Sequence, residues 1–513
     1  MSSERDEYVD WRGKTADPRM HGGIRAASFA CVVEVLENMV FLSNAMNFVA
    51  YFMKSMHYPA AQASNMVTNF MGTSFLLTIF GGFISDSFFT RFTTFIFFCT
   101  MELLGLILLT VQAHETRLQP AMHRRPSRFQ SAILHSGLYA MAIGVGGVKA
   151  SLPAHGADQL DNSDRRLISA FFNWFFFSLC TGGLIAVTVM IWIEENLGWN
   201  WSFKISVLVL TLALCIFTVG FPFYRYKRPA GGSPLTRIFK VIKSQARNRD
   251  QTSSTIMTMI NNILNKTIKY NDFRVLEKAL ADNTITAADV EETKTFIGLL
   301  FIFATTIMMN CCLAQLQTFS VQQGNIMNRT INDFKLPTQS LSVFPLSIML
   351  ASIPLYEHFI RIFGNKFQRP LGRIGLGLAL ASGSMAVAAI VEAKRREAAQ
   401  NNVTLSVFWL GWQYLLLGVA DMFTLGGMLD FFYSEAADSM RSMSTALSWC
   451  STSMGYFLSS LLVSLSNWVT AKFGRPWLGG NDLNHARLDL FYALLSILNL
   501  LNLFNYIYWA KRY

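Results

Sequence analysis

The chain has 513 residues, of which 52% are hydrophobic and only 15% are charged. Because soluble domains usually carry about a quarter charged residues, this deficit excludes an ordinary soluble protein and indicates a membrane protein. The net charge of +11 does not indicate a nucleic-acid partner, because the basic residues are scattered among loops and one linker, as is usual beside membrane spans.

Residues 1–24 form a polar, charged tail without the apolar core of a cleavable signal peptide. We expect this tail in the cytosol. Apolar stretches of about 20 residues then recur along the chain, each long enough to cross a bilayer as a helix. They predict an all-α membrane protein with twelve transmembrane helices, at residues 25–52, 65–84, 92–112, 133–151, 169–193, 201–223, 296–320, 338–356, 371–391, 406–432, 442–470 and 487–510.

The first and fourth spans contain ionisable residues. Glu34 and Glu37 lie one helical turn apart in an apolar run, and Lys149 ends the glycine-rich run 144–149. An ionisable group in hydrocarbon costs about 3 kcal/mol or more, so it normally faces a partner or a wet cavity. Two acids and a lysine on separate spans favour a proton-coupled transport pathway. A structural ion pair between packed helices is the alternative.

A long polar stretch divides the spans into two sets of six. It predicts an N-terminal bundle at 25–223, a cytosolic linker at 224–294, a C-terminal bundle at 295–510 and a cytosolic C-terminus at 511–513. Within the linker, residues 235–246 place apolar side chains on one helical face and basic ones on the other. Such an amphipathic helix fits the cytosolic membrane surface, although a solvated helix would look similar.

An even number of spans puts both termini on one side of the membrane. The Lys and Arg residues of the linker mark that side as cytosolic. The basic loop around Arg124 and the basic run 394–396 then fall outside, which goes against this rule. The glycosylation sequons at Asn328 and Asn402 fall on the same outer side.

The seven cysteines lie within or beside apolar runs, and none forms a CxxC pair. They are therefore expected to be packing thiols, and no metal or other cofactor is expected. No His, Cys and Asp residues stand at a spacing usable for catalysis, so the chain is not expected to be an enzyme.

Two six-helix bundles joined by a long loop resemble the major facilitator fold, whose substrate site lies between the halves at mid-membrane. The segment 81–86, of sequence GGFISD, is similar with Arg91 to that superfamily's signature between spans two and three. The resemblance implies that Asp86 and Arg91 act in gating, by latching the bundles together on the cytosolic side. A generic glycine-rich loop is the alternative.

Further segments in both bundles match a narrower pattern: residues 158–161, 171–180, 314–323, 431–436 and 440–442. These segments resemble the proton-dependent oligopeptide transporter family, in its plant nitrate and peptide branch. Because they touch both bundles, the resemblance covers nearly the whole chain.

Four positions depart from the pattern of this family, one of them Phe301, where relatives commonly have Pro. Peptide carriers have an Arg after the two span-one acids, where this chain has Asn38, and this loss of a cation weakens a peptide assignment. Some nitrate carriers have a His where this chain has Leu313, whose apolar side chain cannot donate to nitrate. On span ten, Asp421 replaces the Glu that is frequent in the family and keeps the charge on a shorter arm.

Residues 37–41, 310–313 and 420–428 resemble one plant subfamily known for carriers of abscisic acid and gibberellins, some members of which are assigned nitrate. The resemblance implies a proton-coupled symporter that imports a small organic acid hormone, expected in the plasma membrane. The alternatives are a low-affinity symporter of nitrate, another small anion or peptide, a membrane sensor without net flux, and a vacuolar location. The expected partners are the substrate, protons and the lipid bilayer.

We expect Lys149 to anchor the substrate carboxylate. Without substrate it would pair with a span-one carboxylate or with Asp421, the expected gating partner. Protonation of Glu34 or Glu37 would release Lys149 for the incoming anion, which couples proton and substrate movement.

Four further residues receive candidate roles. Asn310 and Gln315 on span seven would hydrogen-bond the substrate, with interhelical packing as the alternative. Thr94 resembles the position where some nitrate carriers are phosphorylated, so a regulatory kinase is an expected partner. An aromatic such as Trp449 could line an apolar pocket, although packing is the commoner role.

Overall fold

The computed structural model describes most of the chain. The described residues are 8–121, 124–227, 234–247, 285–331, 334–335, 339–363, 369–474, 476–478, 484 and 486–513. Much of the expected linker at 224–294 therefore lies outside the described residues, as does the start of the N-terminal tail.

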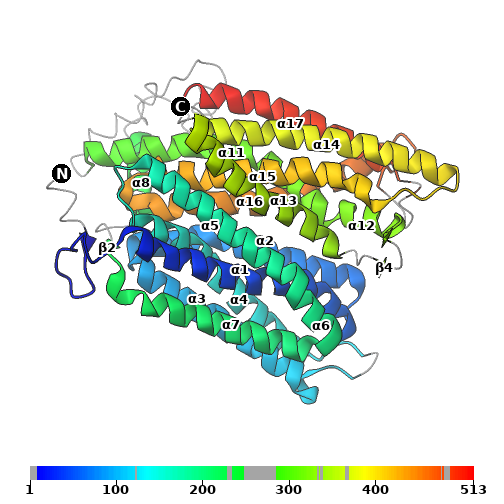
Figure 1. Ribbon diagram of the computed structural model, residues 1–513, viewed down its shortest axis with the longest axis horizontal. Helices are drawn as coiled ribbons and strands as arrows, with labels where there is room; N and C mark the ends of the chain where they lie inside the picture. The colour runs from blue at the N-terminus through cyan, green and yellow to red at the C-terminus, as the bar shows by residue number, and fades with distance from the viewer. Residues whose placement is uncertain are drawn as a thin grey trace.

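The described helices of the first half of the molecule are drawn in blue to green in Figure 1. A π-helical turn, Ala186–Met190, joins α5 to α6, so the predicted span 169–193 is one interrupted helix. The helices are α1 (Gly23–Lys54), α2 (Ala60–Ser87), α3 (Arg91–His114), α4 (Arg128–Asp158), α5 (Arg165–Ile185), α6 (Ile191–Leu197) and α7 (Trp199–Val219).

The described helices of the second half are drawn in green to red in Figure 1. They are α11 (Ala287–Gln317), α12 (Phe319–Ile326), α13 (Val343–Phe363), α14 (Pro370–Gln400), α15 (Leu410–Ser434), α16 (Arg441–Ala471) and α17 (Leu488–Ala510). Short 3-10 turns lie at Thr116–Leu118, Phe221–Phe223, Gln339–Ser342, Val407–Trp409 and Asp438–Met440.

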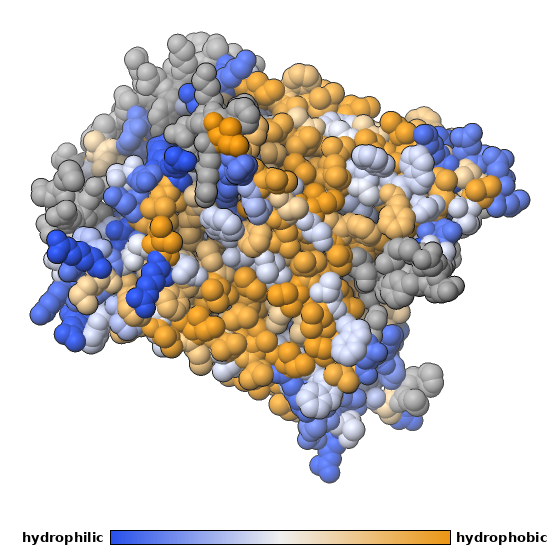
Figure 2. Space-filling view, in the orientation of Figure 1, coloured by the Kyte–Doolittle hydropathy of each residue, from blue (hydrophilic) through white to orange (hydrophobic). Residues whose placement is uncertain are grey.

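Each predicted span coincides with a helix, which confirms the all-α membrane fold. Within the described residues, 11 helices are long and apolar enough to cross a membrane. The remaining predicted span, 442–470, is α16, which is less apolar because it carries a series of buried Ser and Thr residues. Figure 2 shows a band of hydrophobic surface between two hydrophilic ends, as expected for a surface covered by lipid chains.

Glycines let α3 and α4 pack at backbone contact. A Cβ added at Gly105 would lie 2.6 Å from the backbone nitrogen of Met141, and one at Gly147 would lie 1.9 Å from the ring of Phe98. Small residues at helix interfaces allow this close approach in membranes. The contact brings the middle of α3 against the glycine-rich run that precedes Lys149.

Within the described residues, two short antiparallel sheets lie at the ends of the bundles. The strand β1 (Tyr8–Val9) pairs with β2 (Tyr226–Lys227), which ties the N-terminal tail to the end of the first bundle. The strand β3 (Thr330–Ile331) pairs with β4 (Phe334–Lys335) at the opposite end (Figure 1). The end with β1, β2 and the C-terminal residue is the predicted cytosolic end, and that name is used below. Both sequon asparagines, Asn328 and Asn402, belong to the opposite end.

The predicted amphipathic helix is present as α8 (Pro234–Arg247). Phe239 on its apolar face is 65% exposed, whereas Val241 is fully buried. Val241 packs against Val290 of α11, and Ile238 packs against Met440 and Met443. Packing against the bundles, rather than the apolar pattern alone, therefore decides which face of α8 is covered.

Candidate functional site

An ion cluster in the first bundle joins Lys149 of α4 to two acids of α1. The Lys149 Nζ lies 2.8 Å from Glu34 Oε1 and 2.5 Å from Glu37 Oε2, and it donates to Asn38 Oδ1 at 3.2 Å. Glu34 and Glu37 are 0% exposed, and Lys149 is 1% exposed. The structure thus brings together three of the site residues expected from the sequence, and Lys149 is paired with span-one carboxylates.

The cluster has more carboxylate than ammonium. Glu34 and Glu37 are three residues apart in α1, so their side chains leave the same face of the helix. Within the described residues, Glu34 Oε2 and Glu37 Oε1 have no hydrogen-bond partner. Since a buried unpaired charge is costly, the cluster reaches charge balance when one of the two acids binds a proton.

Aromatic side chains surround the ammonium group. The Lys149 Nζ lies 5.4 Å from the ring centroid of Trp449 on α16 and 5.9 Å from that of Phe41. The Trp449 ring stacks on Phe75 of α2, with centroids 5.7 Å apart. Because α16 belongs to the second half of the molecule, Lys149 faces the boundary between the two bundles. The Trp449 Nε1 has no hydrogen-bond partner within the described residues.

Asn310 and Gln315 on α11 are both buried against α16. Asn310 Nδ2 donates to Ser451 Oγ at 2.9 Å, and Thr452 donates to Asn310 Oδ1 at 3.3 Å. Gln315 Nε2 donates to Ser459 Oγ at 2.7 Å. In this conformation both amides serve the packing of α11 on α16, and their expected contact with substrate stays a prediction.

Asp421 is buried on α15 and forms no ion pair with Lys149 within the described residues. Its electrostatic neighbour is Cys180 of α5. The ion pairs of Lys149 within the described residues go to α1 instead. A gating role for Asp421 therefore stays a prediction that needs another conformation.

Asp86 and Arg91 join the two bundles at the predicted cytosolic end. Asp86 accepts from the backbone nitrogens of Ser442 at 3.2 Å and Met443 at 2.8 Å, at the N-terminus of α16. A carboxylate is stabilised there by the unpaired N–H groups and the helix dipole. Arg91 lies 3.6 Å from Asp86 and donates through Nε to Ser442 Oγ at 2.8 Å. The geometry matches the latch expected from the sequence, and its role in gating stays a prediction.

The same junction contains residues to which the sequence analysis gave no role. Arg91 also forms an ion pair with Asp158 of α4. Tyr433 of α15 donates to Asp158 Oδ1 at 2.7 Å, and Arg441 Nη1 lies 4.0 Å from the same oxygen. Asp158, Tyr433 and Arg441 all belong to segments that carried the family resemblance. Their place in these segments is the signal by which the sequence could have identified them.

Thr94 is fully buried at the start of α3, where its hydroxyl donates to the carbonyl oxygen of Thr90 at 3.0 Å. A kinase needs an exposed, flexible segment to bring the hydroxyl into its active site. Phosphorylation of Thr94 therefore requires a conformation that differs from this one.

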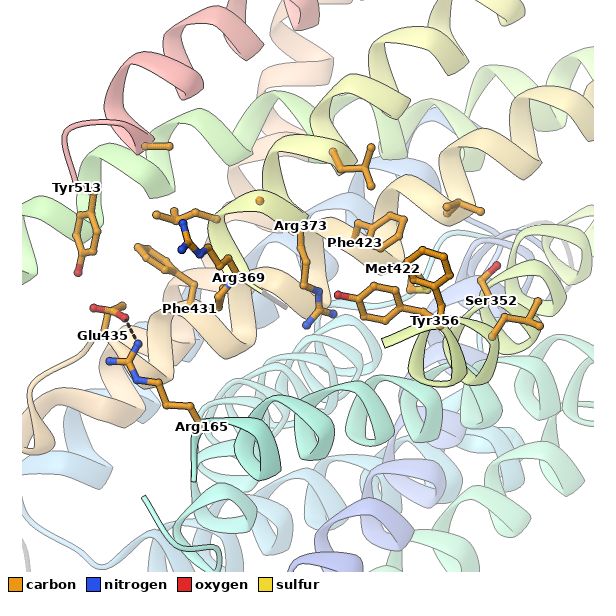
Figure 3. Close-up of a pocket in the computed structure, with 18 residues that line it drawn as sticks. Arg165, Ser352, Tyr356, Arg369, Arg373, Met422, Phe423, Phe431, Glu435 and Tyr513 are labelled. Atoms are coloured by element: carbon orange, nitrogen blue, oxygen red, sulfur yellow. Dashed lines mark hydrogen bonds and ion pairs between the residues drawn. The ribbon is translucent and has the colours of Figure 1, made fainter. Parts of the chain in front are cut away.

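A separate cavity of about 1240 Å³ lies at the predicted cytosolic end of the second bundle (Figure 3). Its walls come mainly from α13, α14 and α15. The Arg373 guanidinium lies 5.1 Å from the ring centroid of Tyr356, and an ion pair of 3.1 Å between Arg165 and Glu435 lies at its edge. None of its lining residues belongs to the Lys149 cluster.

Comparisons with known proteins agree on one family. The model of the PTR2, or POT, family matches residues 92–478. Two Arabidopsis thaliana proteins are similar over 100% of both chains: Protein NRT1/ PTR FAMILY 4.2 at 59% identity and Protein NRT1/ PTR FAMILY 4.1 at 57%. The in meso crystal structure of the POT family transporter PepTSo has a TM-score of 0.68 at 19% identity, covering 95% of this chain and 98% of that chain.

Proposed function

The chain belongs to the POT family of transporters, and from that premise we propose that it is a proton-coupled symporter that imports a small organic acid. It is a multi-pass membrane protein. The proposed substrate is a monocarboxylic acid on an apolar skeleton, such as the plant hormones abscisic acid and gibberellin. The proposed location is the plasma membrane.

The observation that carries this proposal is the pairing of Lys149 with two buried acids at the boundary between the bundles. A lysine ammonium is a compact charge that can exchange one carboxylate partner for another. The rings of Trp449 and Phe41 beside it favour a substrate with an apolar body.

Asn38 supports one carboxylate per substrate rather than a peptide with two charged ends. Its Oδ1 accepts from Lys149, and its Nδ2 donates to the carbonyl oxygen of Leu179 on α5 at 2.8 Å. Both polar atoms of the Asn38 amide are therefore already hydrogen-bonded, and the side chain adds no positive charge to the cluster. Lys149 remains the cation of the cluster within the described residues.

The proposed coupling follows from charge balance. A substrate carboxylate that binds Lys149 displaces Glu34 and Glu37, which are then left buried without a cation. Protons that bind the two acids remove this cost, so substrate binding and proton binding favour each other. The contacts of Asp86 and Arg91 with α16 would have to break before substrate leaves to the cytosol.

Uptake in voltage-clamped oocytes tests the proposal. Labelled abscisic acid, a gibberellin, nitrate and a dipeptide would be offered in parallel at acidic and at neutral external pH. Organic-acid uptake above that of uninjected cells should rise at acidic pH and disappear in Lys149→Ala. The comparison with uninjected cells is needed because a protonated weak acid also diffuses through the bilayer.

Lys204→Ala is the matched control, because Lys204 is exposed on α7 and its substitution should leave uptake unchanged. A nitrate or dipeptide current without organic-acid uptake would replace the proposed substrate with that ion or peptide. Binding of the organic acid without any flux would instead indicate a sensor.

A further inference from the structure

Glu102 of α3 is a buried acid that the proposed coupling does not use. It is 0% exposed, and neither Oε1 nor Oε2 has a hydrogen-bond partner within the described residues. The backbone of α4 packs against Glu102, since a Cβ added at Gly144 would lie 2.4 Å from the Cβ of Glu102. No side chain of α4 separates the two helices at this level.

Glu102 lies close to the Lys149 cluster. Gly144 and Lys149 are five residues apart on α4, which corresponds to about 7.5 Å along the helix axis. The charged and titratable groups that face Glu102 are Glu34 and Glu37 of α1 and Lys149 of α4, and Cys99 precedes it by one turn on α3 itself. Three acids therefore share one ammonium group.

Lys149 cannot satisfy Glu102 in this arrangement. An ammonium group has three N–H donors. Those of Lys149 go to Glu34 Oε1, Glu37 Oε2 and Asn38 Oδ1. An ionised Glu102 would thus be a buried carboxylate without any hydrogen bond, which is among the most expensive states for a polar group.

We propose that Glu102 is a further proton-binding site, which holds a proton on its carboxyl group while Lys149 is paired with α1. The three acids then bind protons as one coupled group rather than as independent sites. When Lys149 moves to a substrate carboxylate, Glu102 is an additional carboxyl that can take up the protons that Glu34 and Glu37 exchange. This last role rests on the proposed function, whereas the protonation of Glu102 does not.

Infrared spectroscopy of the purified full-length protein tests the protonation directly, without substrate. A protonated carboxyl group in a dry site has a carbonyl stretching band that an ionised carboxylate lacks. The unaltered protein at neutral pH should show this band. Glu102→Gln should lose the component that Glu102 contributes, whereas a component from a protonated Glu34 or Glu37 should remain. Glu115→Gln, the same substitution at an exposed position just after α3, should keep it.

Glu102→Asp is the control for a folding defect. It keeps the carboxyl group, so it should keep the band at a shifted frequency. Absence of the band from the unaltered protein, or an undiminished band in Glu102→Gln, would overturn the proposal. Transport adds a second readout: Glu102→Gln should reduce accumulation of the organic acid against a proton gradient more than its exchange across the membrane. A protein that transports no organic acid refutes the proposed function and leaves the infrared result to decide on Glu102.

Discussion

Glu392 in the second bundle and Glu37 in the first are both fully buried acids, yet their surroundings differ. Glu392 receives two hydrogen bonds from Arg395, both at 2.8 Å, and one from Gln323 Nε2 at 2.6 Å. Tyr492 in turn donates to Gln323 Oε1 at 3.0 Å. Around Lys149, by contrast, three acids share one cation, and Glu34, Glu37 and Glu102 all have oxygens without a partner within the described residues.

The contrast distinguishes buried charges that stabilise the helix packing from buried charges that can change during transport. A matched pair such as Glu392 and Arg395 holds helices in one arrangement, because either partner alone would be buried and uncompensated. A cluster with excess acid leaves oxygens that protons can neutralise, so its charge can change without unfolding the protein. The ratio of acids to cations, rather than burial itself, distinguishes the two.

Removal of the cation from the matched pair should have the largest effect on stability. Arg395→Met leaves Glu392 buried without a cation, and breaking a buried pair in this way typically costs about 3–5 kcal/mol. The free energy of unfolding of the purified protein, measured by denaturant titration in detergent, should fall by that amount at neutral pH. A loss below about 1 kcal/mol, as for an exposed ion pair, would contradict this account.

The equivalent substitution in the excess-acid cluster should cost less stability but abolish coupled uptake. In Lys149→Met, Glu34 and Glu37 can each take up a proton and so remove their own charge. We expect a loss of about 1–3 kcal/mol in the free energy of unfolding, the usual cost of buried polar groups left without partners. A loss as large as that of Arg395→Met would erase the distinction between the clusters.

Substitution of Asp86, in the junction with Arg91 at the predicted cytosolic end, should have an effect on stability of intermediate size. Asp86→Asn keeps the shape of the side chain but removes its charge from the N-terminus of α16, where such a charge is worth about 1 kcal/mol. The cytosolic side should therefore open more often. A cysteine introduced at Ala436 should react faster with a membrane-impermeant thiol reagent in inside-out vesicles. Asp161→Asn, an exposed acid that follows α4, is the control and should not change the rate.

The fold was largely predictable, because a continuous run of about 20 apolar residues is the length that a helix needs to cross a bilayer and is rare in soluble domains. The break in the fifth span was not, since the π turn Ala186–Met190 carries no proline or glycine to mark it. The exposed side of α8 could not be predicted either, because it depends on which residues of α11 cover Val241.

The site was predictable where a charge stands in an apolar span, as at Glu34, Glu37 and Lys149. Glu102 carries the same signal in the span 92–112, but its closeness to Lys149 depends on the packing of α3 against α4. The partners of Asn310 and Gln315 could not be predicted, because an amide bonds to whatever hydroxyl the facing helix presents, here Ser451 and Ser459 of α16.

Glu102→Gln should have the smallest effect on stability at neutral pH, within about 1 kcal/mol, because it exchanges one uncharged group without hydrogen bonds for another of the same shape. Its dependence on pH gives the sharper test. If folding holds a proton on Glu102 that the unfolded chain releases, the unaltered protein loses stability as pH rises, because its folded state binds more protons.

The glutamine variant lacks this proton, so its free energy of unfolding should rise relative to the unaltered protein as pH increases from acidic to alkaline. Glu392→Gln should instead lower the free energy of unfolding at neutral pH by about 3–5 kcal/mol, because it leaves Arg395 buried without the carboxylate that accepts two of its hydrogen bonds. The same substitution at two buried glutamates would then have a small effect at Glu102 and a large one at Glu392. A loss in Glu102→Gln as large as that in Glu392→Gln would mean that Glu102 has a cation partner in solution and belongs with the matched pair.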